Sequence, residues 1–411
     1  MARSTKASYA VLAAVTMAHF LNHVYTGALS PFLPLIQIDL NLNYTEIGVV
    51  TSAVVIAMTI SHFVVGYLGD KGARWRDTFI TTSILLSAVA MILVSYSSSF
   101  LILAIFQFFL GVGASGYHPS VFPALAEKFP QRDLAKATGI QAMGGLIGMA
   151  VIPFLGVNLL VALGGWRLSL VALGVIGLVI FAPFILLMRI SNSGYTKGFI
   201  DEEEECEGTV GWTRGYWLGL ALMGLRGMSF RCTSLLMPLY LEATYPVDLI
   251  GAGYLTTIML SAGLVGEMVA APLSDRLNRR VLFLVLSTGI ATPALLLLNY
   301  SLSEGVLILM LIVIGFFFYL GVPPNTAYLT EVSPRENRGL AFGLLFSVGA
   351  IPGAISPIIF GMIGDSFGLP ASILFLVVTT ALATLVALLM KDVEPKSAVS
   401  ETQLGLEFHL Q

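Results

Sequence analysis

Charge is scarce in this sequence. Lys, Arg, Asp and Glu make up 11% of the 411 residues, whereas hydrophobic residues make up 56%. Soluble domains carry about 25% charged residues, so the composition excludes a soluble enzyme of this length, whose surface would need more charge. The formal net charge of −3 gives no reason to expect nucleic acid as a partner.

Cysteine and nucleotide-binding motifs are also lacking. Cys206 and Cys232 are the only cysteines, one between apolar runs and one within a run, which excludes a disulfide framework. No Walker loop occurs, which argues against transport driven by ATP, and no dinucleotide fingerprint follows a strand pattern. The first apolar run is too long for a secretory signal. We expect neither enzyme activity nor a cofactor.

Long apolar runs are what the sequence has instead. Each is about 20 residues or longer, which is enough to cross a bilayer as a helix. We predict an all-α membrane protein with about twelve transmembrane helices. The predicted spans are 9–36, 45–69, 77–97, 100–126, 134–162, 166–189, 214–242, 247–274, 280–299, 304–331, 337–362 and 369–390.

Basic residues fall on one side of these spans. Lys and Arg are enriched in cytoplasmic loops, so we expect a multi-pass protein of the cytoplasmic (inner) membrane with both termini cytoplasmic. The predicted parts are an N-terminal bundle (1–189), a cytoplasmic linker (190–213), a C-terminal bundle (214–391) and a polar tail (392–411). The acidic run 201–205 is interpreted as a solvated linker, with a regulatory or cation-attracting segment as the alternative.

Two spans carry polar residues that are expensive in hydrocarbon. His19, Asn22 and His23 lie in the first span, and Arg226 and Arg231 lie in the seventh. Such residues are functional candidates by default. The two spans also superpose when the chain is shifted by about 204 positions, which places Asn22 on Arg226.

The same shift relates the two halves along most of their length. The matched pairs are mainly helix-breaking or polar: Ser30 and Ser234, Pro34 and Pro238, Gly111 and Gly315, Pro119 and Pro323, Glu127 and Glu331, Pro153 and Pro357. With one inserted residue, His62 matches Glu267 and Asp70 matches Asp275. Two six-span copies share one orientation, so we predict two parallel-repeat six-helix bundles.

At this point the chain resembles a major facilitator superfamily transporter over essentially its whole length. The loop Gly66-Tyr-Leu-Gly-Asp70-Lys-Gly-Ala-Arg74 is similar to the family's cytoplasmic loop motif, and Asp275 to Arg279 repeats it. An acid at a helix end beside basic residues can form a charge-assisted network between spans. We therefore expect Asp70, Arg74, Asp275 and Arg279 to act in gating.

Other family motifs match with departures. Gln107 stands where the resemblance implies an Arg tied to proton coupling in drug antiporters, and Gly145 stands where an antiporter motif has Pro. The strings His19-Phe-Leu-Asn22-His23 and Gly116-Tyr-His118-Pro119 resemble the branch that includes fosmidomycin-resistance exporters. That branch implies proton-driven export of a small anionic compound.

The resemblance implies that spans 1, 4, 7 and 10 line a central cavity. A buried guanidinium suits a carboxylate, phosphate or phosphonate, and we expect Arg226 to face the substrate. The alternative for Arg226 is a buried ion pair with Glu267. The alternative for Arg231 is a side chain that extends outward to the membrane surface. Further substrate-binding candidates, given in full, are Asn22, His23, Tyr25, Arg231, Tyr319 and Asn325.

The remaining expectations concern protons and metals. His19, His23 and Glu267 are candidates for proton coupling, because imidazole titrates near neutral pH and burial favours a neutral carboxyl. HxxxH on one helical face can also hold a transition metal. His62 is read as structural, and His118 is placed at a break in the fourth span. Tyr117 and Gln141 are further polar candidates for the cavity.

We expect a secondary active transporter that moves a small organic anion by alternating access. Its partners would be the solute, protons and the lipid bilayer, and we expect a monomer. Proton-coupled efflux by an antiporter is preferred. The alternatives are proton-coupled uptake of an organic acid, a divalent metal carrier that uses His19 and His23, and a channel-like or sensor protein without alternating access.

Overall fold

A computed structural model describes residues 2–69, 71–193, 209, 211–334, 341, 344–345 and 349–393. Within this part of the chain the secondary structure is helical, apart from one isolated bridge between Thr209 and Pro334. The prediction of an all-α protein is confirmed. Asp70, Cys206, the acidic run and the polar tail from 394 onward lie outside the described residues.

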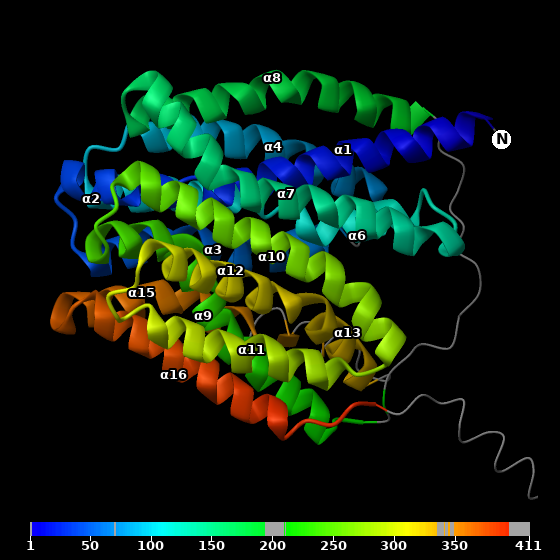
Figure 1. Ribbon diagram of the computed structural model, residues 1–411. Helices are drawn as coiled ribbons and strands as arrows, with labels where there is room; N and C mark the ends of the chain where they lie inside the picture. The colour runs from blue at the N-terminus through cyan, green and yellow to red at the C-terminus, as the bar shows by residue number, and fades with distance from the viewer. Residues whose placement is uncertain are drawn as a thin grey trace, which may run out of the picture.

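The first half of the chain forms helices up to Ser193 (Figure 1). They are α1 (Ala2–Gly27), η1 (Ser30–Phe32), α2 (Leu33–Leu40), α3 (Tyr44–Gly69), α4 (Ala73–Ser95), α5 (Phe100–Ala114), α6 (His118–Ala126), α7 (Gln131–Leu163) and α8 (Trp166–Ser193). Helix α1 packs on α7 and α8, α4 packs on α5 and α8, and α3 packs on α5. We call these helices the N-terminal bundle.

The second half begins at Arg214 and repeats this arrangement. Its helices are α9 (Arg214–Thr244), α10 (Leu249–Leu277), α11 (Arg280–Leu297), α12 (Glu304–Leu320), α13 (Val322–Val332), α15 (Ala350–Phe367) and α16 (Leu369–Leu388). Helix α9 packs on α15 and α16, and α12 packs on α10 and α11. We call these helices the C-terminal bundle. The first half of the predicted span 337–362 falls largely outside the described residues.

Two spans are broken at matching points of the repeat. The fourth span stops at Ala114 and restarts at His118, and the tenth stops at Leu320 and restarts at Val322. Pro119 and Pro323 each sit in the first turn of the new helix, where the missing N–H costs nothing. The predicted break at His118 is confirmed, and it turns this side chain toward the interior.

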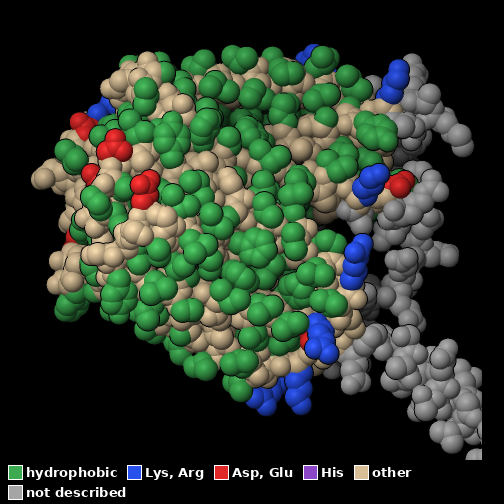
Figure 2. All heavy atoms as spheres, viewed as in Figure 1, with side chains coloured by type: hydrophobic (Ala, Val, Ile, Leu, Met, Phe, Trp, Pro, Cys, Tyr) green, Lys and Arg blue, Asp and Glu red, His purple; other side chains and the backbone are tan. Residues whose placement is uncertain are grey.

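The outer surface suits a bilayer. Ten helical segments of the described chain are long and apolar enough to cross a membrane. Helices α1 and α9 are not among them, because polar residues interrupt their apolar runs. Figure 2 shows hydrophobic side chains between one end that carries Lys and Arg and an opposite end that carries Asp and Glu. We call these ends the basic end and the acidic end.

The two bundles close on each other at the acidic end. Asp365 of α15 accepts backbone N–H bonds from Tyr44 and Thr45, at 2.9 and 2.8 Å, and so caps the start of α3 from the other bundle. Gly48 permits the close approach, because a Cβ there would lie 2.2 Å from the Pro357 carbonyl oxygen. Nearer the centre, the Ser30 hydroxyl donates to the Leu235 carbonyl at 2.7 Å.

Toward the basic end the bundles separate. A cavity of about 610 Å³ lies among α7, α10 and α13, lined in part by Thr138, Glu267, Arg280 and Thr330. We call this cavity the vestibule. The described chain therefore adopts a conformation that is closed at the acidic end and hollow toward the basic end.

Candidate functional site

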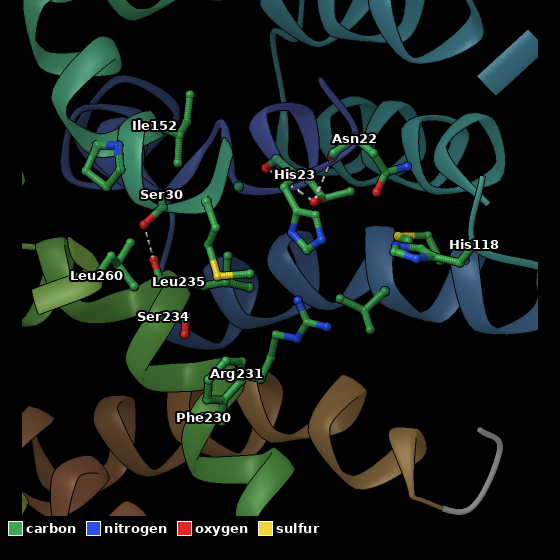
Figure 3. A pocket seen from close by; sticks show the side chains of 16 residues that line it. Asn22, His23, Ser30, His118, Ile152, Phe230, Arg231, Ser234, Leu235 and Leu260 are labelled. Carbon is green, nitrogen blue, oxygen red and sulfur yellow. Dashed lines mark hydrogen bonds between the residues drawn. The ribbon is translucent and has the colours of Figure 1, made fainter. Parts of the chain in front are cut away.

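A second, smaller cavity of about 100 Å³ lies where the two bundles meet. Helices α1, α3, α6 and α7 line it from the N-terminal bundle, and α9 and α10 line it from the C-terminal bundle (Figure 3). We call it the central cavity. Its polar lining residues are Asn22, His23, Thr26, Ser30, His118, Arg231 and Ser234. The lining contains no Asp or Glu, so the cavity is suited to an anion rather than to an organic cation.

Histidines gather on the N-terminal side of the central cavity. His19 and His23 share one face of α1, one turn apart, with ring centroids 4.8 Å from each other. The break before α6 brings His118 beside them, at 5.3 Å from His19 and 5.9 Å from His23. Sequence reasoning placed His118 at the break but not in the site. The available signal was the string Tyr117-His118-Pro119. The Pro marks a break in the helix, and the side chain next to a break can point in a direction that a continuous helix would not give it.

His19 is held inside the N-terminal bundle rather than in the cavity lining. Its Nδ1 lies 3.0 Å from the Gln141 carbonyl oxygen and 2.8 Å from the Gln141 side-chain nitrogen. The Tyr117 ring stacks on His19 at 4.9 Å, and its hydroxyl donates to the Val15 carbonyl at 2.9 Å. Tyr117 and Gln141 therefore act as partners that orient His19, one layer behind the cavity.

Arg231 faces the central cavity, with its guanidinium directed toward His23 (Figure 3). It makes no hydrogen bond or ion pair with any described residue. A guanidinium carries five N–H donors and remains charged. A cation that is left without a partner inside a membrane protein is energetically costly. Its position in the cavity lining is suited to pairing with an anion.

Arg226 is buried at the contact between α9 and α12. It is only 7% exposed and is absent from the lining of the central cavity. Its guanidinium donates to the Phe318 carbonyl oxygen of α12 and lies 5.6 Å from the Phe230 ring centroid. The five-residue spacing sends the two Arg side chains in different directions, and Arg231 is the one in the cavity lining.

Asn22 lines the central cavity and is only 5% exposed. Its side-chain nitrogen donates to the Ala114 carbonyl at 2.8 Å, which fixes the orientation of the amide. The amide oxygen has no hydrogen-bond partner in the described structure. Leaving a buried acceptor without a partner costs about 1–3 kcal/mol.

Three further substrate-binding candidates lie outside the cavity lining. Tyr25 is buried between α1 and α8, with its hydroxyl 3.4 Å from the Leu173 carbonyl oxygen. Tyr319 crosses between the bundles, and its hydroxyl lies 2.6 Å from the Met149 sulfur. Asn325 is buried on α13, with an amide oxygen that has no described partner. Tyr25 and Asn325 thus do not line the central cavity in this conformation, whereas Tyr319 contacts Met149, which does.

Glu267 lies in the vestibule and not in the central cavity. It forms no ion pair with Arg226 or with any other described basic residue. The pairing that the sequence left open is therefore not made in this conformation. A carboxyl group in the vestibule is accessible from the basic end.

The charge networks near the basic end lie within each bundle and repeat across the two halves. Arg76 pairs with Glu127 in the first half, and Arg280 pairs with Glu331 and Asp275 in the second. Shifting Arg76 and Glu127 by 204 positions gives Arg280 and Glu331. Arg74 and Arg279, the predicted basic partners, are exposed. Sequence reasoning used Glu127 and Glu331 as repeat markers but missed their Arg partners.

Comparison with known proteins fits this architecture. The sequence profile of the Major Facilitator Superfamily matches residues 15–225 and again residues 219–408. A bacterial homologue of the human lysosomal transporter Spinster, in an inward-facing and occupied conformation, superposes with a TM-score of 0.76. It shares 16% identity, and the match covers 92% of this chain and 96% of that one.

Curated relatives at similar identity are named as transport or resistance proteins. A probable sulfoacetate transporter, SauU, of Cupriavidus necator is 24% identical, with 90% of each chain covered. A cis,cis-muconate transport protein of Acinetobacter baylyi is 24% identical, covering 83% of this chain and 84% of that one. A fosmidomycin resistance protein of Escherichia coli is also 24% identical, with 89% of each chain covered.

The chain belongs to the Major Facilitator Superfamily. It is a multi-pass membrane protein that transports small organic solutes, and it is not an enzyme. The family predicted from the cytoplasmic loop motif is thereby confirmed.

Proposed function

We propose that this protein takes up a small organic anion together with a proton. The observation that carries the proposal is Arg231, a guanidinium in the lining of the central cavity with no described partner. An anion in this cavity can accept hydrogen bonds from Arg231, and its charge offsets the cost of burying the guanidinium. Arg226, which donates to the Phe318 carbonyl, then stabilises the contact between α9 and α12.

The neighbourhood of Arg231 supports cotransport rather than exchange. His23 faces Arg231 across the cavity (Figure 3). A proton on His23 adds positive charge beside the anion, so anion and proton strengthen each other's binding and travel together. The sequence favoured export, in which a proton and the solute exchange places. Cooperative binding instead favours uptake, driven by a proton gradient directed into the cell.

The vestibule provides a second proton site in this proposal. Glu267 lines the vestibule, which lies toward the basic end. We assign the basic end to the cytoplasm, because Lys and Arg are enriched in cytoplasmic loops. Both termini are then cytoplasmic, and the conformation faces inward. Bacterial relatives support a location in the cytoplasmic membrane.

Gating completes the proposed cycle. Our candidates for holding the basic end closed when the acidic end opens are Asp70 and Arg74 in the first half and Asp275 and Arg279 in the second. Arg280 joins them, because it already binds Asp275 in the present conformation. The acidic end then separates where Asp365 caps α3.

Thermal stability of the purified protein tests the anion site. A small carboxylate or sulfonate at 100 times its dissociation constant should stabilise the protein by about 2.7 kcal/mol. Arg231→Gln should abolish that stabilisation. Arg226→Gln is the matched control and should keep it, although the baseline melting temperature falls. Stabilisation that survives in Arg231→Gln would refute the proposal.

The divalent metal carrier is the second candidate, favoured by one observation. One ring nitrogen each of His19, His23 and His118 lies within 4.8 Å of the other two, a donor set that transition metals accept. The guanidinium of Arg231 beside His23 opposes a cation there. The metal carrier would be supported if Ni²⁺ or Zn²⁺, but no anion, stabilised the protein and if His118→Gln removed this stabilisation.

A further inference from the structure

Imidazole rings are concentrated at one place in the N-terminal bundle. The His19 ring centroid lies 4.8 Å from that of His23 and 5.3 Å from that of His118. His62 adds a further ring, 6.0 Å from His118, so that four of the five histidines in the chain are in contact. His23 and His118 also line the central cavity, where an ion can reach them (Figure 3). Neutral imidazole is the commonest metal ligand in proteins.

Three of these rings can close on one ion. One ring nitrogen each of His19, His23 and His118 lies within 4.8 Å of the other two. Nitrogen ligands in a tetrahedral zinc site lie about 2.0–2.1 Å from the metal, and therefore about 3.4 Å from one another. Small side-chain rotations bring the three nitrogens to that separation and leave a fourth position for water.

The surroundings of His19 supply the support that a metal ligand needs. A ligating histidine usually donates its second ring N–H to a carbonyl or carboxylate. The Gln141 backbone carbonyl oxygen lies 3.0 Å from His19 Nδ1 and is placed to accept such a bond, which leaves Nε2 for the metal. Tyr117 stacks on the same ring at 4.9 Å and holds its plane. The movement needed for binding then falls to His23 and His118.

The same arrangement argues against the ion as cargo. All three ligands belong to α1 and α6 of the N-terminal bundle, whereas a solute carried by alternating access is held between two bundles. The C-terminal bundle offers no carboxylate in the cavity lining, and its one charged residue there is the cation Arg231. Closing the bundles around a metal ion would therefore bring like charges together at low dielectric constant.

We propose that His19, His23 and His118 form an inhibitory site for a divalent transition-metal ion such as Zn²⁺ or Ni²⁺. The bound ion stays with the N-terminal bundle and opposes the approach of Arg231 from the C-terminal bundle. It also takes the His23 nitrogen that the proposed function needs for the proton. The metal site stands on the ring positions alone, and its inhibitory effect rests on the proposed function.

Zinc alone tests the site on the purified full-length protein, without an affinity tag and without any solute. Calorimetry should show one Zn²⁺ ion bound per chain. His118→Gln should weaken the affinity by at least about tenfold, because it removes a ligand. Arg231→Gln should bind Zn²⁺ more tightly, because a cation leaves the cavity lining. No zinc binding, or binding that is unchanged in His118→Gln, would overturn the site.

His62→Gln is the matched control, since His62 contacts His118 but is not among the three ligands. This variant should bind Zn²⁺ as the unchanged protein does. Cobalt spectroscopy of the unchanged protein does not depend on whether His118→Gln folds. Co²⁺ held by three nitrogens in tetrahedral geometry should absorb strongly in the visible, and Zn²⁺ should remove the bands. Only the weak absorption of the hydrated ion would contradict the site.

Liposomes that contain the protein and an internal zinc-sensitive dye distinguish an inhibitor from a cargo. Zn²⁺ should not enter, and it should reduce methanesulfonate uptake driven by a pH gradient to the level of liposomes without protein. A chelator should restore uptake, and His118→Gln should be insensitive to Zn²⁺. Zinc entry, or zinc binding without inhibition, would overturn the inhibitory role. Absence of methanesulfonate uptake even without zinc would overturn the proposed function and the inhibition that rests on it, while the zinc titration still decides the metal site.

Discussion

The two bundles share a backbone plan but bring different chemistry to the central cavity. The N-terminal bundle contributes Asn22, His23 and His118, which are neutral or titratable, while the C-terminal bundle contributes the permanently charged Arg231. The shift of about 204 positions matches Arg231 with Gly27 and His23 with Gly227. The charged and titratable side chains of the cavity therefore do not follow the repeat. A symmetric scaffold can thus supply two halves of a site with separate tasks.

Under the proposed function, the C-terminal bundle binds the charge of the solute and the N-terminal bundle takes up the proton. The scaffold contacts behave differently, because they follow the repeat. Arg76 with Glu127 matches Arg280 with Glu331, and the helix breaks at 115–117 and 321 match as well. Symmetry is therefore kept in the contacts inside each bundle and lost in the lining of the central cavity.

The largest expected effect comes from removing the proton response of the N-terminal bundle. The groups that face His23 are His19, His118 and Arg231, and under the proposed function a proton on His23 adds positive charge beside the bound anion. Anion affinity should therefore rise as pH falls from about 8 to about 5, the range in which histidine titrates. In His23→Gln the affinity should be nearly independent of pH, and accumulation of anion driven by a pH gradient should be lost.

Calorimetry in buffers of different ionisation enthalpy measures the protons taken up with the anion. His62→Gln is the control, because His62 lies 6.0 Å from His118 and outside the cavity lining. It should keep the proton uptake of the unchanged protein. Proton uptake that persists in His23→Gln but disappears in Glu267→Gln would move the coupling site to the C-terminal bundle.

An intermediate effect is expected where the bundles meet at the acidic end. Asp365→Asn weakens the cap that Asp365 provides to Tyr44 and Thr45 across the interface. Capping contacts contribute about 0.5–2 kcal/mol, so the equilibrium should shift toward opening at this end by a factor of about 2–30. Pulsed electron spin resonance between labels on Ile38→Cys and Phe367→Cys, both exposed positions, measures the shift.

The native cysteines are replaced by Ser for this measurement. Glu46→Gln serves as the comparison, because the Glu46 carboxylate accepts the Asn43 backbone N–H at 2.9 Å within one bundle. It should leave the distance at the acidic end unchanged. An unaltered distance distribution in Asp365→Asn would show that apolar packing around Gly48 and Pro357 holds this end closed without the cap.

The smallest effect is expected for a surface pair inside the N-terminal bundle. Arg167 of α8 binds Asp39 of α2, and both side chains are 42% exposed. Exposed pairs contribute about 0–1 kcal/mol, so Arg167→Gln should lower the melting temperature only slightly. It should not change the label distance at the acidic end, since both partners belong to one bundle. A change comparable to that of Asp365→Asn would mean that closure depends on the total charge of the acidic end.

The sequence was sufficient for the scaffold and for part of the site. The helical membrane fold and the family followed from three features that can be seen in the sequence. These are the apolar runs, the placement of Lys and Arg on one side of the predicted spans, and the internal repeat. Asn22 and His23 were found because polar residues inside apolar runs stand out. His118 was placed at a break by Pro119, but its position beside His19 and His23 depends on how α6 packs against α1.

Only the tertiary structure showed that Arg231, and not Arg226, lies in the lining of the central cavity. Both lie in the same apolar run, and their spacing shows that they point in different directions without showing which direction is the cavity. Arg226 donates a hydrogen bond to the Phe318 carbonyl oxygen of α12, whereas Arg231 lies beside His23 in the cavity lining. Helix rotation is set by packing against neighbours that lie far away in the sequence, and therefore local composition determines the span while the assembled bundles determine the site.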